Sequence, residues 1–352
     1  MKKIPRIDSE TTLIDAISRR FSSQNNKSVR LGIGDDGAVL RLKPGTEVVV
    51  TTDFTIENRH FRRDRHPPES VGHRCLARGL SDLAAMGATP VAAFISISLP
   101  ASMLAKPAGR TWITKFFDGL HSLAKMHHVP LAGGDTSRSP GGQSALIFAD
   151  IVLVGTVPKG KALRRSGAAV GDALYVTGQL GGAAAELASV LRSKRVVRVA
   201  ATEDHPHLFP EPRLDVGEAL LRRGLATACM DLSDGLSTDL NRLCRASGLG
   251  AKVEESALPV HPLARKSGVG KALAAALHGG EDYELLFTAP AGVRMSPSLA
   301  GVNITRIGTM TRARGEVPPA ILLQADGKRV ALKPGGWEHF SQAETKAKRA
   351  SR

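Results

Sequence analysis

The chain of 352 residues has few cysteines and no long apolar segment. Cys75, Cys229 and Cys244 are widely spaced in apolar surroundings, which excludes a disulfide framework and a CxxC metal site. No apolar run approaches the length that spans a bilayer, and the basic N-terminus lacks the apolar core of a signal peptide. We therefore expect a reducing compartment, the cytoplasm, and no contact with a membrane.

Aromatic residues are also scarce, at 4% of the sequence, so few side chains are available for stacking on nucleic-acid bases. The formal net charge is +15, but the lysines and arginines are dispersed in short groups. No dense basic helix and no nucleic-acid-binding motif is present. We expect the positive charge to favour solubility and to attract small anions, such as phosphorylated substrates, rather than nucleic acid.

Several common catalytic signatures are missing. Residues 155–162 resemble a phosphate-binding P-loop, but Ala162 replaces the hydroxyl that would bind Mg²⁺, and Pro158 removes an N–H group. There is no GxSxG elbow, HExxH motif, protein-kinase motif set or convincing Rossmann fingerprint. The adjacent His127 and His128 fit a helix end or a surface better than a metal site.

The sequence does have the length and apolar content for two domains, with 42% hydrophobic residues. Segments with strand-like and helix-like patterns alternate, which predicts an α/β (α+β) fold. A segment rich in Lys, Arg and Gly after residue 155 is typical of a domain junction, so we expect an N-terminal domain over residues 1–155 and a C-terminal α/β domain over 156–340. Residues 341–352 should form a basic, disordered tail.

Apolar periodicity predicts the individual elements. Helices are expected over residues 8–22, 70–86, 111–127, 181–191, 213–223 and 233–246. Strands are expected over residues 48–52, 91–99, 145–154, 173–177, 228–230 and 283–288, with a final strand pair within 303–323. Asp53 would then end a strand, Asp82 would lie in the last turn of a helix, and Asp234 would lie at a helix start.

Acidic residues beside glycines and hydroxyls are the most informative feature of the chain. In GIGDDGAVL, residues 32–40, Asp35 and Asp36 precede an apolar run, where an unpaired charge is costly. Similar acids occur in TTD at 51–53, LSDL at 80–83, GGDT at 133–136, DLSDG at 231–235 and GGEDY at 279–283. Oxygen ligands suit Mg²⁺, and glycines let backbone N–H groups approach phosphate closely. The set predicts a metal–phosphate site.

Each acidic motif also has a simpler local explanation. Asp35 and Asp36 could form a turn, Asp53 could simply end a strand, and Asp234 could be favoured by a helix dipole. Glu281 and Asp282 could lie in a hairpin loop. One shared site accounts for all six motifs together, although they could serve two sites.

In order and spacing, the motifs resemble those of the thiamine-monophosphate kinase family, in the aminoimidazole-ribonucleotide-synthetase-like superfamily, over residues 8–340. The matching segments are GIGDDGAVL at 32–40, TTDF with His60 and Phe61, LSDLAAMGATP at 80–90, LAGGDTSR at 131–138, LRRSGAAVGDALYVTG at 163–178, MDLSDGLSTDL at 230–240, GGEDYELLFT at 279–288 and GWEHF at 336–340.

The resemblance implies transfer of the ATP γ-phosphoryl group to thiamine monophosphate, giving thiamine diphosphate as the final step of its biosynthesis. A phosphate monoester has a second pKa of about 6, so the attacking oxygen needs no strong general base. Several Mg²⁺ ions held by carboxylates would neutralise the two polyanions and align a direct in-line transfer.

The resemblance also implies roles for residues at matching positions. The metals are expected at Asp36, Thr51, Thr52, Asp53, Asp82, Asp135, Asp231 and Asp234, with Asp53, Asp82 and Asp234 nearest the transfer. ATP is expected at Gly134, Asp135, Arg165 and Ser233, and thiamine monophosphate at His60, Glu281 and Trp337. Trp337 could stack on the thiazolium or could instead be a core anchor. Asp35 could shape its loop or bind through water.

The implied architecture is a homodimer in which N-terminal strands form a barrel across the interface. The chain departs from the family pattern at Asn58 and Arg59, at residues 136–139 and at Glu338, which bears on the specificity for the acceptor. The alternatives are an aminoimidazole ribonucleotide or selenophosphate synthetase-like enzyme, or a non-catalytic ATP- or anion-binding protein. A selenophosphate synthetase would need a reactive cysteine near the N-terminus, whereas the first one here is Cys75.

Overall fold

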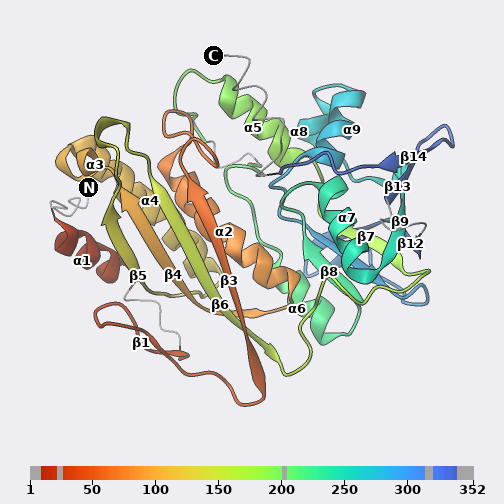
Figure 1. The fold of residues 1–352 in the computed structure, drawn as a ribbon, viewed down its shortest axis with the longest axis horizontal. Coiled ribbons are helices and arrows are strands. Elements are labelled where there is room, and N and C mark those ends of the chain that lie inside the picture. The colour runs from red at the N-terminus through yellow and green to blue at the C-terminus, as the bar shows by residue number, and fades with distance from the viewer. Residues whose placement is uncertain (1–8, 22–26, 200–203, 314–319, 339–352) are drawn as a thin grey trace.

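The computed structural model describes residues 9–21, 27–199, 204–313 and 320–338 (Figure 1). It contains two α/β domains, each built on its own β-sheet, as the alternating sequence pattern predicts. The basic tail expected at 341–352 lies outside the described residues.

The first domain contains a four-stranded sheet with the order β3-β6-β4-β5. Only β4 and β5 are parallel; the other neighbours are antiparallel. The strands are β3 (Thr46–Ile56), β4 (Thr89–Leu99), β5 (Leu131–Arg138) and β6 (Phe148–Pro158). The helices are α1 (Glu10–Phe21), α2 (Pro68–Ala85), α3 (Ala101–Ala105) and α4 (Pro107–Met126), and a 3-10 turn, η1, spans Gly142–Ser144.

The helices α2 and α4 pack against each other over one face of this sheet. Two glycines allow the close approach: a Cβ at Gly72 would lie 1.8 Å from the Phe116 carbonyl oxygen, and a Cβ at Gly119 would lie 1.8 Å from that of Glu69. Leu76, Leu80 and Leu83 of α2 are completely buried between the helix and its neighbours. The apolar period of α2 thus fixes which side of the helix faces the core.

A short hairpin, β1 (Val29–Leu31) and β2 (Val39–Leu40), lies on the other side of the first sheet. Its apolar residues pack with Val91, Ala92 and Ala132 in a small separate cluster. The loop between the two strands carries the glycine-flanked acids of residues 32–38.

The second domain contains a mixed sheet with the order β14-β13-β9-β12-β7-β10-β8, and β11 pairs with β12. Its strands are β7 (Ala173–Thr177), β8 (Ala228–Asp231), β9 (Leu249–Glu254), β10 (Leu285–Ala289), β11 (Ser298–Leu299), β12 (Val302–Arg312), β13 (Ala320–Leu323) and β14 (Arg329–Leu332). Its helices are α5 (Gly182–Arg192), α6 (Leu214–Arg222), α7 (Leu236–Ser247), α8 (Pro262–Arg265) and α9 (Val269–His278), with a 3-10 turn, η2, at Glu255–Ala257.

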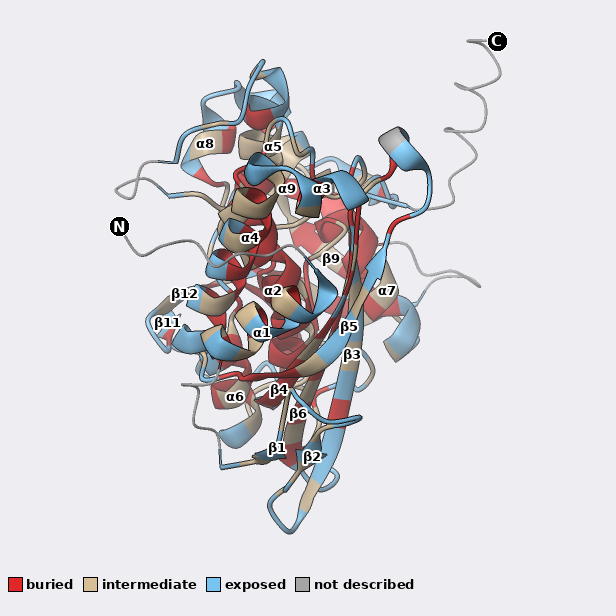
Figure 2. Cartoon of the chain, turned by 90° about the vertical axis from the view of Figure 1, so that its left-hand side faces the viewer, coloured by how far each residue is buried: buried red, intermediate tan, exposed pale blue. Residues whose placement is uncertain are grey.

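The helix α2 connects the two domains, because it also contacts α6 and β8. Figure 2 shows it as a largely buried element in the middle of the molecule, whereas much of β3 is exposed. The main hydrophobic core is continuous from α1 to β10. Residues of α2 are therefore the ones best placed to link the acids of the two domains.

Most of the expected elements are present, with several differences. The strand expected over 48–52 continues to Ile56, so Asp53 does not end it, and GGDT lies within β5. The segments β12 and β13 are not partners, because β9 lies between them. The described strands of the first domain form an open sheet and no closed barrel. In the described part of the chain, no helix combines the length and apolarity needed to cross a membrane.

Candidate functional site

Carboxylates from both domains meet around α2. We call Asp53 of β3, Asp82 of α2 and Asp231 at the end of β8 the interdomain acid cluster. Thr51 Oγ1 donates a hydrogen bond to Asp82 Oδ2, and Ser81 Oγ donates one to Asp231 Oδ2 (2.9 Å). Hydroxyls of one domain thereby orient the carboxylates of either domain.

The carboxyl groups of this cluster lie where negative charge is costly. Burial, reinforced by neighbouring carboxylates such as Asp82, raises the pKa of Asp53 to about 6, although Arg78 opposes the shift. Burial and the charge of Asp82 also raise the pKa of Asp231, and burial raises that of Asp82. The cluster is therefore short of positive charge and would bind a cation favourably.

Two arginines supply part of that charge. Arg78, one turn before Asp82 on α2, lies with its Nε 3.5 Å from Asp53 Oδ1. The exposed Arg165 is close enough to oppose the pKa increase of both Asp82 and Asp231. The positive charge of Arg165 thus acts on two of the three carboxyl groups of the cluster.

The first sheet separates the two adjacent threonines. Successive residues of a strand point to opposite faces, so Thr51 and Asp53 face α2 while Thr52 faces away. There Thr52 Oγ1 donates to Asp150 Oδ1 of β6 (2.6 Å). Asp150 is paired across the sheet with Ser96 of β4, and Ser96 is paired with Asp135 of β5, so these three side chains lie on the same face. Thr52 and Asp135 therefore lie on the opposite face from Thr51 and Asp53.

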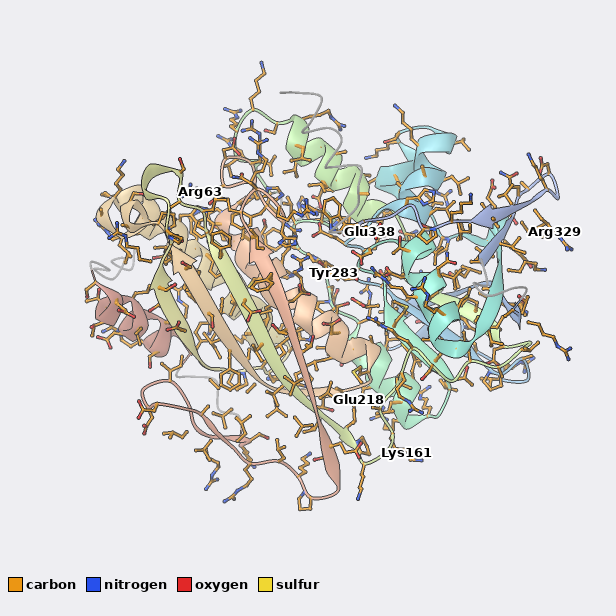
Figure 3. All side chains as sticks on the ribbon, viewed as in Figure 1. Arg63, Lys161, Glu218, Tyr283, Arg329 and Glu338 are labelled. Carbon is orange, nitrogen blue, oxygen red and sulfur yellow. The ribbon has the colours of Figure 1, made fainter. Side chains whose placement is uncertain are left out.

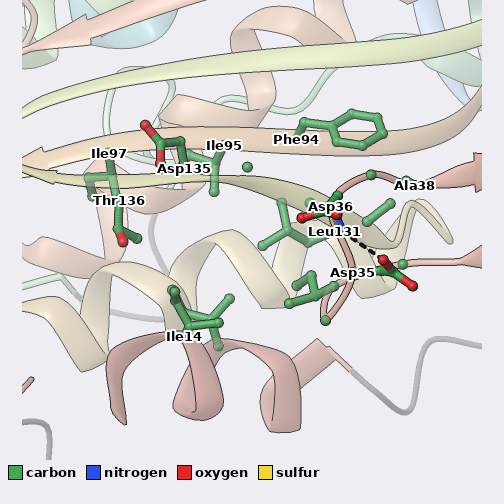
Figure 4. A pocket seen from close by; sticks show the side chains of 18 of the residues that line it. Ile14, Asp35, Asp36, Ala38, Phe94, Ile95, Ile97, Leu131, Asp135 and Thr136 are labelled. Atoms are coloured by element: carbon green, nitrogen blue, oxygen red, sulfur yellow. Dashed lines mark hydrogen bonds between the residues drawn. The ribbon is translucent and has the colours of Figure 1, made fainter. Parts of the chain in front are cut away.

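A cavity of about 560 Å³ lies beside β5, between α1 and the loop of residues 32–38 (Figure 4). Asp35 and Asp36 line it, and the Asp36 N–H donates to Asp35 Oδ1 (2.9 Å). Both acids are exposed and β2 has only two residues, so the expected entry into a buried strand is wrong. Figure 4 shows Asp135 and Thr136 pointing to opposite sides of β5.

Gly134 also lines this cavity, and packing within the sheet explains why it is glycine. Its φ is +147°, and a Cβ would lie 1.9 Å from the carbonyl oxygen of Ile95 on the neighbouring strand. A side chain could not be accommodated without moving β4 or β5. The position is restricted by the fold whether or not ATP contacts it.

Asp234 lies in the turn before α7, whose N-cap is Gly235. The expected helix start at Ser233 is therefore three residues early. Asp234 Oδ2 accepts a hydrogen bond from Arg242 Nη1 (2.5 Å), and the Asp234 N–H donates to Asp239 Oδ2 (2.9 Å). Asp234 thus belongs to an ion-pair network at the start of α7.

The acids of the GGEDYE segment at 279–284 are engaged in structural contacts. Glu281 pairs with Arg74 (2.6 Å). Asp282 accepts hydrogen bonds from the N–H groups of Gly181 and Ala183 at the start of α5 (2.7 and 3.1 Å). Glu284 pairs with Arg213 (2.6 Å). The hairpin-loop interpretation of this motif is wrong, because the segment joins the helix α9 to the strand β10 and does not join two paired strands.

The three residues expected near thiamine monophosphate surround the junction of the domains. His60 Nδ1 accepts a hydrogen bond from the Ile56 N–H (3.0 Å), and the Trp337 N–H donates to the Asp234 carbonyl oxygen (3.0 Å). The third residue, Glu281, is two positions from Tyr283, which Figure 3 shows near the middle of the molecule. The Tyr283 hydroxyl is buried without a hydrogen-bond partner among the described residues.

The donor chemistry of the acid cluster fits Mg²⁺. Its groups are carboxylate and hydroxyl oxygens, and Mg²⁺ is commonly bound by one or two carboxylates, with substrate phosphates and water completing its shell. In the portion of the chain that is described, no three His, Cys, Asp or Glu side chains converge tightly enough to hold a metal by themselves. The protein side of the site is thus consistent with a metal that arrives with phosphates.

Sequence reasoning missed Arg74, Arg78, Asp150 and His207. The helical spacing of Arg74, Arg78 and Asp82, each four residues apart in an otherwise apolar helix, is a signal that could have identified one polar stripe on α2. Asp150 and His207 offer no comparable local signal, because their partners are distant in the sequence.

Comparisons with known proteins show which family the chain resembles. Two family models match the chain, "AIR synthase related protein, N-terminal domain" over residues 34–157 and "AIR synthase related protein, C-terminal domain" over 169–316. Thiamine-monophosphate kinase of Escherichia coli strain K12 is 38% identical over 321 residues, covering 89% of this chain and 93% of that protein.

Two solved structures are similar over nearly the whole chain. Thiamine-monophosphate kinase from Stenotrophomonas maltophilia K279a matches with a TM-score of 0.77 and 34% identity, covering 91% of this chain and 97% of that one. AaThiL complexed with AMPPCP and TMP matches with a TM-score of 0.70 and 30% identity, covering 94% of this chain and 97% of that one.

Proposed function

The chain belongs to the thiamine-monophosphate kinase family, and from that premise we propose that it transfers the γ-phosphoryl group of ATP directly to the phosphate of thiamine monophosphate. The observation that carries the proposal is the meeting of Asp53, Asp82 and Asp231 from two domains beside Arg165. A relative bound to AMPPCP and TMP supports the choice of the two substrates. Thiamine diphosphate and ADP are the products.

The residues of this chain supply position and charge, and no single side chain acts as a general base. The acceptor phosphate is already largely ionised at neutral pH, so its oxygen can attack without losing a proton to the protein. Thr51 and Ser81 hold the carboxylates of Asp82 and Asp231 in fixed orientations. Arg165 would bind a transferring or leaving phosphate as a bidentate donor.

Mg²⁺ would be held by Asp53, Asp82 and Asp231 together with the phosphates of the substrates. When bound, it neutralises the negative charge of two polyanions and favours an in-line arrangement. Thr52 and Asp135, on the other face of the sheet, would serve a second set of phosphate or metal contacts together with Asp36. Asp234, in the turn before α7, would contribute a further carboxylate to the metal site.

ATP would bind at the cavity beside β5. Its lining includes Gly133, Gly134 and Asp135 from β5 and Asp35 and Asp36 from the loop. A volume of about 560 Å³ is in the range of small-molecule sites. We assign this role to an N-terminal domain over 1–155, with Arg165 and Ser233 as further ATP contacts. Acceptor binding would lie at its junction with the domain over 156–340, where His60 and Trp337 lie.

A second copy of the chain would pair with the exposed edge of the first sheet. Val48, Val50 and Phe54 of β3 are 50%, 61% and 59% exposed on the face that points away from α2. An exposed apolar edge strand favours association. A homodimer whose two sheets close a barrel would cover these residues, and Val50→Lys should shift the chain to a monomer in light-scattering measurements.

A product assay tests the function. Purified protein with ATP, Mg²⁺ and thiamine monophosphate should form equal amounts of thiamine diphosphate and ADP in a single turnover. Slow ATP hydrolysis without thiamine diphosphate would show that the kinase assignment is wrong. ATP consumption with the acceptor of either synthetase in place of thiamine monophosphate would instead support the synthetase alternatives, and ATP binding without turnover would support a non-catalytic protein.

A further inference from the structure

Arg74 and Glu281 form a buried ion pair between the two domains. Arg74 Nη2 lies 2.6 Å from Glu281 Oε1, and the two side chains are only 3% and 18% exposed. Removing two charges from water is costly unless their remaining hydrogen-bonding groups are satisfied. The partners around the pair therefore indicate what it does.

On one side, Arg74 holds the loop of residues 56–61. Its Nη1 donates a hydrogen bond to the His60 carbonyl oxygen (2.8 Å). Within the loop, the Asn58 N–H donates to the Phe61 carbonyl oxygen (2.7 Å) and the His60 N–H to that of Ile56 (2.8 Å). A single guanidinium thus connects the loop that follows β3 to the second domain.

On the other side, two neutral histidines lead away from Glu281. His207 Nδ1 lies 3.1 Å from Glu281 Oε2, and His207 Nε2 lies 3.1 Å from His66 Nε2. His66 Nδ1 lies within hydrogen-bond distance of both the Arg62 N–H (3.0 Å) and the Arg62 carbonyl oxygen (3.2 Å), so the ring is anchored to the backbone of Arg62.

Both oxygens of Glu281 are consequently directed at protein groups. Its backbone is engaged as well, because the Glu281 N–H donates to the Ser233 carbonyl oxygen (2.8 Å) beside the Asp231 turn. Burial alone would raise the pKa of Glu281, but Arg74, His207 and Arg78 outweigh it and hold the pKa well below the ordinary range. An ionised Glu281 can therefore keep Arg74 in place.

We infer that Glu281 is a positioning residue for the acceptor side of the reaction. Through Arg74 it fixes loop 56–61, and through His207 and His66 it fixes residues 62–66, which lead from that loop into α2. This inference rests on the proposed function, since loop 56–61 carries His60, which is expected beside the acceptor. It replaces direct contact between Glu281 and thiamine monophosphate with an action through Arg74.

A double-mutant cycle of Arg74→Met and Glu281→Gln tests this inference. Each single variant should raise KM for thiamine monophosphate about 10-fold and leave KM for ATP within about twofold, and the double variant should be no worse than the singles because they break one linkage. Arg74→Lys should recover thermal stability but not KM, since an ammonium lacks the fork that reaches both partners.

His66→Gln provides a second variant, at a residue other than Arg74. It interrupts the series of contacts from Glu281 through His207 to His66 and should also raise KM for the acceptor. Glu69→Gln is the matched control. Glu69 lies on the same helix as Arg74 but forms an exposed pair with Lys115 of α4 (2.8 Å), so its loss should leave both KM values unchanged. If only Glu281→Gln raised KM while Arg74→Met and His66→Gln did not, Glu281 would contact the acceptor and the inference would be wrong.

Hydrogen exchange separates this inference from the proposed function. The amides of Asn58 and His60 should exchange faster in Glu281→Gln and Arg74→Met than in the parent chain, whatever the enzyme activity. Unchanged exchange in loop 56–61 would overturn the positioning role even if the parent chain forms thiamine diphosphate. Absence of product from the parent chain, together with faster exchange in the variants, would reject the kinase function alone.

Discussion

The guanidinium carbon of Arg59 lies 4.0 Å from the ring centroid of Trp337. Arg59 follows β3 in the first domain, whereas Trp337 is attached to the turn before α7 through its N–H group and the Asp234 carbonyl oxygen. The contact therefore crosses the junction of the domains. A cation on a tryptophan face is also the arrangement expected for a bound thiazolium, so Arg59 and the acceptor ring would compete for Trp337.

Arg59→Ala should lower KM for thiamine monophosphate by roughly 2- to 5-fold, because an exposed cation–π contact is worth about 0.5 to 1 kcal/mol. Steady-state kinetics, with Trp337 fluorescence as a second readout, would measure this. Arg62→Ala, which removes only an exposed pair with Asp64, is the control. An increase in KM would mean that Arg59 helps to bind the acceptor, contrary to this prediction.

Asp53→Asn should reduce kcat by at least about 100-fold without unfolding the chain, since a carboxylate next to the reacting phosphates is lost while the strand is kept. A product assay measures kcat, and circular dichroism shows whether the chain stays folded. Glu47→Gln, at the other end of β3, should keep near-normal turnover. Near-normal turnover in Asp53→Asn would remove Asp53 from the metal site.

Gly134→Ala should lower stability by about 3 kcal/mol, because the new Cβ would overlap the Ile95 carbonyl oxygen and φ is positive. Gly133→Ala should cost less, since its Cβ would meet the edge of the Phe94 ring at 2.9 Å and the ring can shift. Thermal unfolding measures the loss of stability, and the same measurement with ATP shows whether either variant also weakens ATP binding. Equal melting temperatures for the two variants would contradict the packing argument.

Acid should destabilise the chain through buried His73. Burial lowers the pKa of His73 to about 4 from the ordinary 6.5, so between these values the unfolded chain binds the proton and the folded chain does not. Stability should fall as pH decreases from 6.5 to 4, by up to about 1.4 kcal/mol per pH unit from this group.

Denaturant unfolding at several pH values measures that slope. His73→Gln can still donate to the Pro210 carbonyl oxygen, which His73 Nε2 contacts at 2.8 Å, and should flatten the slope with little change at pH 8. An unchanged slope would mean that another group, such as His66, dominates the acid response.

Local sequence patterns were sufficient for most of the fold. The apolar period of α2 and the β-branched run of β3 predicted a helix and a strand at these places, because the periods of 3.6 and 2 residues depend only on which side is buried. The motifs also predicted one shared site for Asp53, Asp82 and Asp231; the fold brings these three side chains together, and their role as metal ligands stays a prediction. Element ends were less certain: β3 continues through Asp53 because it pairs with β6 up to Ile56.

The tertiary structure decided which of these residues act together. Thr51 and Thr52 are neighbours in the chain, yet the sheet directs one to Asp82 and the other to Asp150. Glu281 and Arg74 are 207 residues apart and form a buried pair that no local pattern indicates. Periodicity determines the side of an element that is buried, whereas the packing of α2 against both domains determines the partners, and that packing depends on the whole chain.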